Sequence, residues 1–127
     1  AIARDEETAR QIAAGWLLAY LTRMGPLYPR MLRDQFEYAH EVDALLAANS
    51  SGGLPQLPAA AERLAREVTV MATYDQAPDA VRDWLEAGAD AIDLVLPLGL
   101  PEEQLREMLE AVAPAATSSS KAEATRP

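Results

Sequence analysis

Apolar residues recur every three to four positions through the first part of the chain. Between Asp5 and Met24 they form a single stripe, which comprises Ala9, Ile12, Ala13, Trp16, Leu17, Tyr20, Leu21 and Met24. This spacing predicts one amphipathic helix, with Asp5 at its N-cap. The aromatic residues of the stripe, together with Phe36 and Trp84, are expected to pack in the core or between a helix and the rest of a barrel.

Three residues that disfavour helix, Gly25, Pro26 and Pro29, follow this stripe. Proline removes a backbone donor and clashes with the preceding turn, so a break or sharp bend is expected here. A broader apolar face from about Arg30 to Ala48 predicts a second helix. The polar and glycine-rich run Asn49–Gly53 then predicts a loop.

The second half of the chain alternates between short helical and strand-like patterns. A short helix is predicted from Pro58 to about Glu67, and the β-branched run Val68–Met71 predicts a strand. A helix is expected between Pro78 and Gly88, with the glycine as its C-terminal cap. The apolar run Ile92–Leu96 predicts a second, buried strand, and Pro101 opens a last helix.

The two predicted strands and the helix between them make one right-handed βαβ unit with parallel strands. Such a pair leaves its outer edges unpaired, which is marginal in isolation and favours association. The sequence therefore predicts that the chain is the end of a larger sheet or barrel, or that it completes its sheet with a partner or as a homo-oligomer.

Composition narrows the classes of partner. The chain has 127 residues, of which half are hydrophobic, and this length suits one domain with a core. Twenty acidic against eleven basic residues give a net charge of −9, which argues against binding to nucleic acid or an anionic membrane. From Ala115 the apolar periodicity is lost, so residues 1–114 are predicted to fold and residues 115–127 to form a disordered tail.

The chain contains no cysteine, which excludes disulfides, thiolate metal sites and thiol nucleophiles. This composition fits a reducing cytoplasm. The longest apolar run, Ile12–Leu21, is far shorter than a membrane span. The chain begins with Ala1 and shows no signal-peptide pattern, as expected of a processed chain or a fragment.

Three stretches carry a family resemblance: Thr69–Val81, Glu86–Asp90 and Leu96–Glu103. They resemble the carboxy-terminal end of luciferase-like monooxygenases, most closely the deazaflavin-dependent branch. Those enzymes are similar in running a strand, a helix, an Ala-Gly-x-Asp helix end, a strand and a Pro-x-Gly turn before a final helix. The chain departs from the family pattern in having Ala72 where glycine is usual, and a longer turn before Pro78.

The resemblance implies a fold class and a chemistry. It implies that the chain is the carboxy-terminal part of a (β/α)8 TIM-type barrel, with three helices followed by a β-α-β-α unit. The implied activity is that of a flavin- or deazaflavin-dependent oxidoreductase, in which FMN or a 5-deazaflavin coenzyme transfers hydride or activates oxygen on a small organic substrate. Most of the cofactor site would then lie outside these residues, and the chain alone would be inactive.

In a barrel the functional residues lie at the carboxyl ends of the strands. The resemblance therefore makes Thr73, Tyr74 and Gly99 the candidate cofactor contacts, with Asp75 and Pro97 beside them. Turn chemistry before a helix explains Asp75, Pro97 and Gly99 equally well.

Other titratable residues are weaker candidates. Asp90 and Asp93 flank the amino end of the second predicted strand, where polar residues stabilise a barrel, so they are not expected to be catalytic. His40 is the only histidine and lies among charged residues of a predicted helix, which indicates a surface or packing role. Glu102 and Glu103 at the start of the last helix would repel a phosphate.

Two further classes of function remain open. A non-catalytic helical or α/β module could bind a partner through its exposed apolar strand edges. Another barrel enzyme could share the same helix–strand pattern, because one fold serves many activities.

Overall fold

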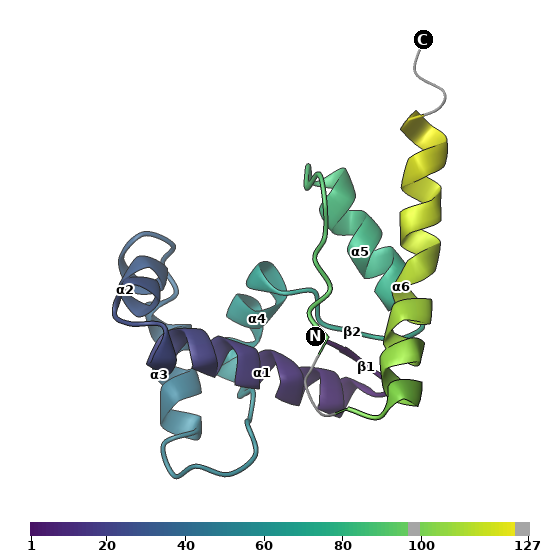
Figure 1. Cartoon of the computed structure of the whole chain (residues 1–127). Helices are drawn as coiled ribbons and strands as arrows, with labels where there is room; N and C mark the ends of the chain where they lie inside the picture. Colours follow the sequence, from purple (N-terminus) through teal and green to yellow (C-terminus); the bar gives the residue numbers. More distant parts are fainter. Residues whose placement is uncertain (97–99, 124–127) are drawn as a thin grey trace.

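Asp5 begins the first long helix, as the sequence predicts. In the computed structural model its side chain accepts hydrogen bonds from the backbone N–H and the hydroxyl of Thr8, both 2.8 Å long. The structure describes residues 1–96 and 100–123, with side chains described as far as residue 114. Within these residues it is a mostly helical α/β structure with six α-helices and two short strands (Figure 1).

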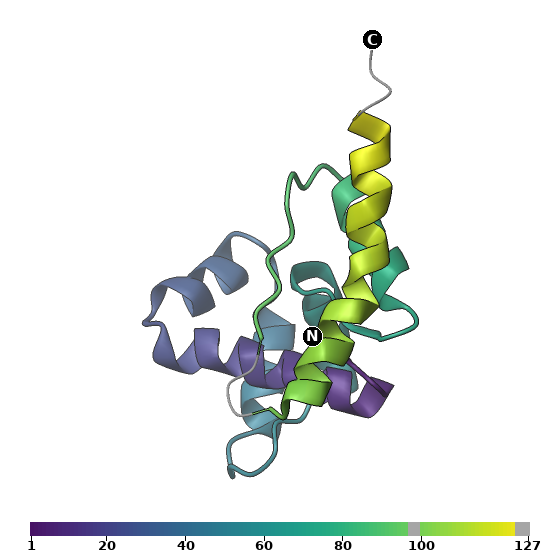
Figure 2. The same cartoon turned by 45° about the vertical axis from the view of Figure 1, so that its right-hand side comes forward.

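Helices make up most of the chain, and each of the two strands is followed by a helix. The elements are β1 (Ile2–Ala3), α1 (Glu6–Arg23), α2 (Leu27–Asp34), α3 (Ala39–Ala48), a 3-10 turn η1 (Ala59–Ala61), α4 (Glu62–Val68), β2 (Ala72–Thr73), α5 (Ala77–Glu86) and α6 (Glu102–Glu123). Figures 1 and 2 show α1 lying across the molecule, with α2 and α3 at one end and the strands, α5 and α6 at the other.

The two strands are parallel, but they are not the two strands that the sequence predicts. Ile2 pairs with Ala72 and Ala3 with Thr73, so the crossover runs through α1 to α4. The sequence analysis misses β1 because two residues carry no periodicity. A parallel sheet is confirmed, but the predicted βαβ unit is wrong, because the paired strands are different ones and α1 to α4 lie between them.

The predicted strand Val68–Met71 is wrong in its bounds, since the observed strand β2 begins only at Ala72. Val68 is the last residue of α4, and the Thr69 N–H and hydroxyl both bond to the Ala65 carbonyl, at 3.0 and 2.8 Å. These bonds carry the helical turn past the β-branched residues, so the strand starts at Ala72. Tertiary and local hydrogen bonding therefore override β-propensity at this point.

The second predicted strand, Ile92–Leu96, is not a strand in the structure. Residues 91–96 are irregular, and the described residues form a two-stranded sheet that does not close into a barrel. The predicted helix from Arg30 to Ala48 is also divided. Glu37 adopts a positive φ of 59°, and the Tyr38 N–H bonds to the Leu32 carbonyl at 2.9 Å, which separates α2 from α3.

Both of the last helices begin where proline predicts, but only α5 ends where glycine predicts. Gly88 has a φ of +109°, and the N–H groups of Gly88 and Ala89 bond back to Leu85 and Trp84 at 3.1 Å, which caps α5. Helix α6 continues beyond Pro114 to Glu123, where the sequence predicts a disordered tail from Ala115. Residues 124–127 lie outside the described part of the chain.

The core has two parts that meet along α1. The first joins α1, α3, η1 and α4 through fully buried side chains such as Val42, Leu45 and Leu64. The second joins the strands to α5 and α6 through Ile2, Ala72, Ala77 and Met108. Small residues of α1 with no more than 1% exposure, namely Ala9, Ala13 and Ala14, allow its neighbours to approach closely.

Ion pairs hold the helices of the first core together. Arg10 of α1 pairs with Glu62 of α4 and also donates to the Leu57 carbonyl at 2.9 Å. Arg63 donates to the buried Glu41 at 2.7 Å and lies 4.6 Å from the centre of the Tyr38 ring. These contacts join α4 to both α1 and α3.

Two predicted core aromatics are largely exposed. Trp16 is 44% exposed and Phe36 54% exposed, so their prediction as core residues is wrong. Phe36 lies in the turn between α2 and α3, and Trp16 lies on the side of α1 away from the first core, 5.2 Å from the Tyr20 ring. No helix in the described residues is long and apolar enough to cross a membrane.

Candidate functional site

The carboxyl ends of β1 and β2 open at the same edge because the strands are parallel. The Tyr74 N–H donates to the Ala3 carbonyl at 2.9 Å, which continues the ladder just past both strands. Residues 4–6 and 74–76 therefore leave the sheet side by side, each leading into a helix. This is the edge at which α/β proteins usually bind their ligands.

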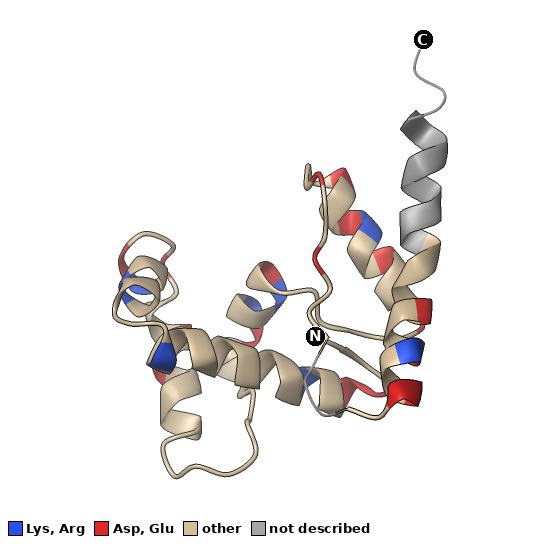
Figure 3. Cartoon of the chain, in the orientation of Figure 1, with Lys and Arg blue, Asp and Glu red and all other residues tan. Residues whose placement is uncertain are grey.

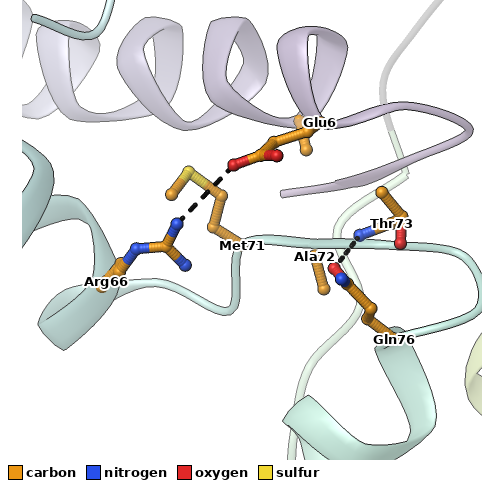
Figure 4. Close-up of a pocket in the computed structure, with 7 residues that line it drawn as sticks. Glu6, Arg66, Met71, Ala72, Thr73 and Gln76 are labelled. Atoms are coloured by element: carbon orange, nitrogen blue, oxygen red, sulfur yellow. Dashed lines mark hydrogen bonds and ion pairs between the residues drawn. The ribbon is translucent and has the colours of Figure 1, made fainter.

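A small pocket lies beside this edge (Figure 4). Its volume is about 100 Å³, and it is lined by Glu6, Ala9, Arg66, Met71, Ala72, Thr73 and Gln76. The Thr73 N–H donates to the Gln76 side-chain oxygen at 3.2 Å, and the Gln76 N–H bonds back to the Thr73 carbonyl at 3.1 Å. The Thr73–Gln76 turn is thus closed by two bonds.

The opposite wall of the pocket carries charge. The guanidinium of Arg66 lies 3.8 Å from the Glu6 carboxylate and 2.8 Å from that of Glu62. Figure 4 shows Met71 beside the Arg66–Glu6 pair, with Thr73 and Gln76 beyond Ala72. A pocket of this size holds a few water molecules or one small polar group, because each water occupies about 30 Å³ in the liquid. It is too small for a flavin ring.

Tyr74 lies next to a second charged pair at the same edge. Arg4 donates to Glu107 of α6 through two nitrogens, at 2.8 and 2.6 Å. This pair lowers the pKa of Glu107 and raises that of Arg4. Burial raises the pKa of the Tyr74 phenol, Glu107 raises it further and Arg4 opposes the shift. Tyr74 is therefore a neutral hydrogen-bonding group at pH 7.

The structure places some of the predicted site residues together and separates others. Thr73 and Tyr74 lie at the shared strand edge, and Asp75 is exposed beside them. Pro97, Leu98 and Gly99 lie outside the described residues. His40 is exposed on α3. Within the part of the chain that the structure describes, no three His, Asp or Glu residues are grouped to hold a metal ion.

Sequence reasoning missed four polar residues at this edge: Arg4, Glu107, Arg66 and Gln76. Gln76 follows Thr73 by three positions, a spacing that could have suggested the turn. Arg4 and Glu107 are 103 positions apart, and no local pattern relates them.

A much larger apolar groove lies on the other side of α1. Its volume is about 710 Å³. Its walls come from Ile12, Gly15, Trp16 and Ala19 of α1, residues 68–70, residues 90–95, and single side chains of α5 and α6. Asp90 and Asp93 are exposed at this groove and do not flank a strand, so the position that the sequence predicts for them is wrong.

The fold and the two hollows define a mostly helical α/β protein with a polar strand edge and a separate apolar groove. A comparison with protein-family models, curated proteins and solved structures finds no match.

Proposed function

We propose that this chain is the carboxy-terminal portion of a flavin- or deazaflavin-dependent oxidoreductase with a luciferase-like (β/α)8 barrel. The observation that carries the proposal is the parallel register of β1 and β2. Each strand leads from the same edge of the sheet into a helix. Parallel strands that each lead into a helix are also the building unit of a barrel, but here helices α1 to α4 lie between the two strands.

Thr73 and Tyr74 are the residues proposed to contact the cofactor. Both lie at the carboxyl edge of the strands, and Tyr74 is a half-buried neutral phenol beside the Arg4–Glu107 pair. A bound isoalloxazine or deazaflavin ring would supply the hydride chemistry. The role of these residues is to donate hydrogen bonds to the ring edge and to orient it against a small organic substrate.

The test is a titration of the protein expressed from its complete reading frame with FMN and with the deazaflavin coenzyme. Absorbance and fluorescence are expected to change with one of them, and Tyr74→Phe is expected to weaken binding about tenfold through loss of one hydrogen bond. Asp79→Asn is the control, since Asp79 is exposed on α5 and its ion pair with Arg82 lies within that helix. If neither cofactor changes either signal, the proposal is wrong.

The chain of residues 1–127 alone is expected to bind neither cofactor tightly. The pocket at the strand edge is about 100 Å³, whereas sites for drug-sized ligands are roughly 300–1,000 Å³. The groove of about 710 Å³ is lined by neither Thr73 nor Tyr74, the proposed cofactor contacts. A submicromolar dissociation constant for this chain would contradict the placement of the main cofactor site outside it.

A further inference from the structure

The segment from Asp90 to Leu96 is extended and mostly apolar. Figures 1 and 2 show it running as a trace from the end of α5 toward α1. Within the described residues, none of the backbone N–H or C=O groups of residues 90–96 makes a hydrogen bond. Val95 is 60% exposed, and Ile92 and Leu96 are 36% exposed. Leu94 alone packs against the second core and anchors the segment.

This segment forms one wall of the apolar groove of about 710 Å³. Trp16, on the opposite wall, is 44% exposed. An occupant that buried these side chains would also remove the neighbouring backbone groups from water. Leaving a buried N–H or C=O unpaired costs about 1–3 kcal/mol. An acyl chain cannot pair with these backbone groups because it has no hydrogen-bonding atoms. A helix cannot pair with them because its own N–H and C=O groups already bond to one another. An added β-strand can pair with them.

Charge indicates the composition of such a strand. Asp90 and Asp93 line the groove, are exposed and form no ion pair within the described residues. Among the described residues no Lys or Arg lines the groove, and the Ala1 ammonium that lines it already donates to the Val70 carbonyl. The trace that follows α5 carries acidic positions and no basic ones (Figure 3). The whole chain carries a net charge of −9. A basic partner is therefore favoured, whereas a second copy would bring like charges together.

We propose that residues 90–96 are a strand-addition site for an extended segment of a partner protein, with apolar residues flanked by Lys or Arg. The apolar side chains fill the groove against Trp16, Ile92 and Val95, and the basic side chains pair with Asp90 and Asp93. This proposal does not depend on the proposed oxidoreductase function, since it needs no cofactor.

The test uses two synthetic peptides with the same alternating Val and Thr core, one with Lys at both ends and the other with Glu. Titrations are followed by amide NMR and hydrogen exchange on the isotopically labelled chain of residues 1–127. The Lys peptide is expected to bind at least about tenfold more tightly, with the advantage falling at high salt. On binding, the amides of residues 91–96 are expected to become protected.

Two variants separate the charge contribution from the backbone contribution. Asp93→Asn is expected to reduce the preference for the Lys peptide about threefold or more, whereas Asp34→Asn, an exposed carboxylate on α2, leaves it unchanged. Val95→Pro removes one backbone donor and is expected to abolish binding. Val95 is 60% exposed, so the thermal midpoint of this variant should stay close to that of the parent.

Several outcomes would overturn the proposal. One is equal affinity for the two peptides, and another is unchanged binding by Val95→Pro. Protection of residues 91–96 before peptide is added would mean that the segment already pairs within the chain. If sedimentation shows a dimer, and the amides of residues 91–96 lose their protection when the dimer is diluted, then a second copy of the chain occupies the groove. The cofactor titration would be unaffected by any of these results.

Discussion

The guanidinium of Arg4 donates two hydrogen bonds to the carboxylate of Glu107, although the residues are 103 positions apart. Arg4 follows β1 directly, and Glu107 lies in the first part of α6. The pair therefore joins the carboxyl end of the first strand to the last helix. It also sets the charge environment of Tyr74, whose phenol responds to both residues.

Replacing Arg4 by Met should uncouple β1 from α6 with a small loss of stability. The pair is largely solvated, with side-chain exposures of 61% and 31%, so the midpoint of thermal unfolding is expected to fall by about 1–4 °C. Arg106→Met is the control, because its pair with Glu102 lies wholly within α6 and is more exposed. If both variants lower the unfolding midpoint equally, the Arg4–Glu107 pair contributes no more stability than a pair within one helix.

Leu64→Ala should destabilise the first core strongly. Leu64 is fully buried between α1, α3 and α4, and truncating such a residue typically costs about 2–5 kcal/mol. Urea unfolding followed by circular dichroism measures the change. Leu54→Ala, at a side chain that is 74% exposed, is expected to alter the free energy of unfolding by less than about 0.5 kcal/mol.

Gly88→Ala tests whether the cap of α5 depends on backbone freedom. A Cβ at Gly88 would meet no atom within 4 Å, but the φ of +109° is strained for any residue with a side chain. We expect a loss of about 1–3 kcal/mol in the free energy of unfolding. The neighbouring Ala87→Gly, at a φ of −71°, should change it by about 0.5 kcal/mol or less. A neutral Gly88→Ala would contradict this reading of the cap.

The Glu41–Arg63 pair predicts a loss of stability in acid. The Arg63 hydrogen bond, a backbone bond and Coulombic attraction lower the pKa of Glu41 in the folded state. A lowered pKa contributes stability at pH values above the unfolded value of about 4.3, and this contribution is lost as pH falls through the folded value. Glu41→Gln should be less stable at pH 7 and should lose less stability on acidification.

Equilibrium unfolding of both proteins between about pH 7 and pH 2 measures this difference. The two stability curves should converge toward the acid end, where Glu41 is protonated. Parallel curves over the whole range would show that the pair does not contribute to the pH dependence.

The helical part of the fold could be predicted because its signals are local. The N-cap at Asp5 and the cap at Gly88 lie where the sequence predicts them, and so does the break at Gly25 and Pro26, but α2 already begins at Leu27 and includes Pro29. Capping, proline geometry and a positive φ each depend on a few neighbouring residues. The split at Glu37 is the exception, because it is set by the inward position of Tyr38 against the first core.

The candidate site could be predicted only in part. The sequence pattern predicts Thr73 and Tyr74 at the end of a strand, and the structure puts them at the shared edge of two parallel strands. The Arg4–Glu107 and Arg66–Glu6 contacts bring together residues far apart in sequence, and no periodicity encodes such pairs.

Residue type and short spacing are enough to predict most of the helix ends and to exclude cysteine chemistry, because each of these signals is local. Neither the two residues of β1 nor their parallel partner follows from such local signals, and the packing of the helices fixes both. Ile2–Ala3 occupies the edge of Ala72–Thr73, and Ile92–Leu96 stays extended along an apolar groove with no backbone partner within the described residues. Segments far apart in the sequence can each pair with the same strand. Which of them does so depends on which segment the packed helices place next to that strand.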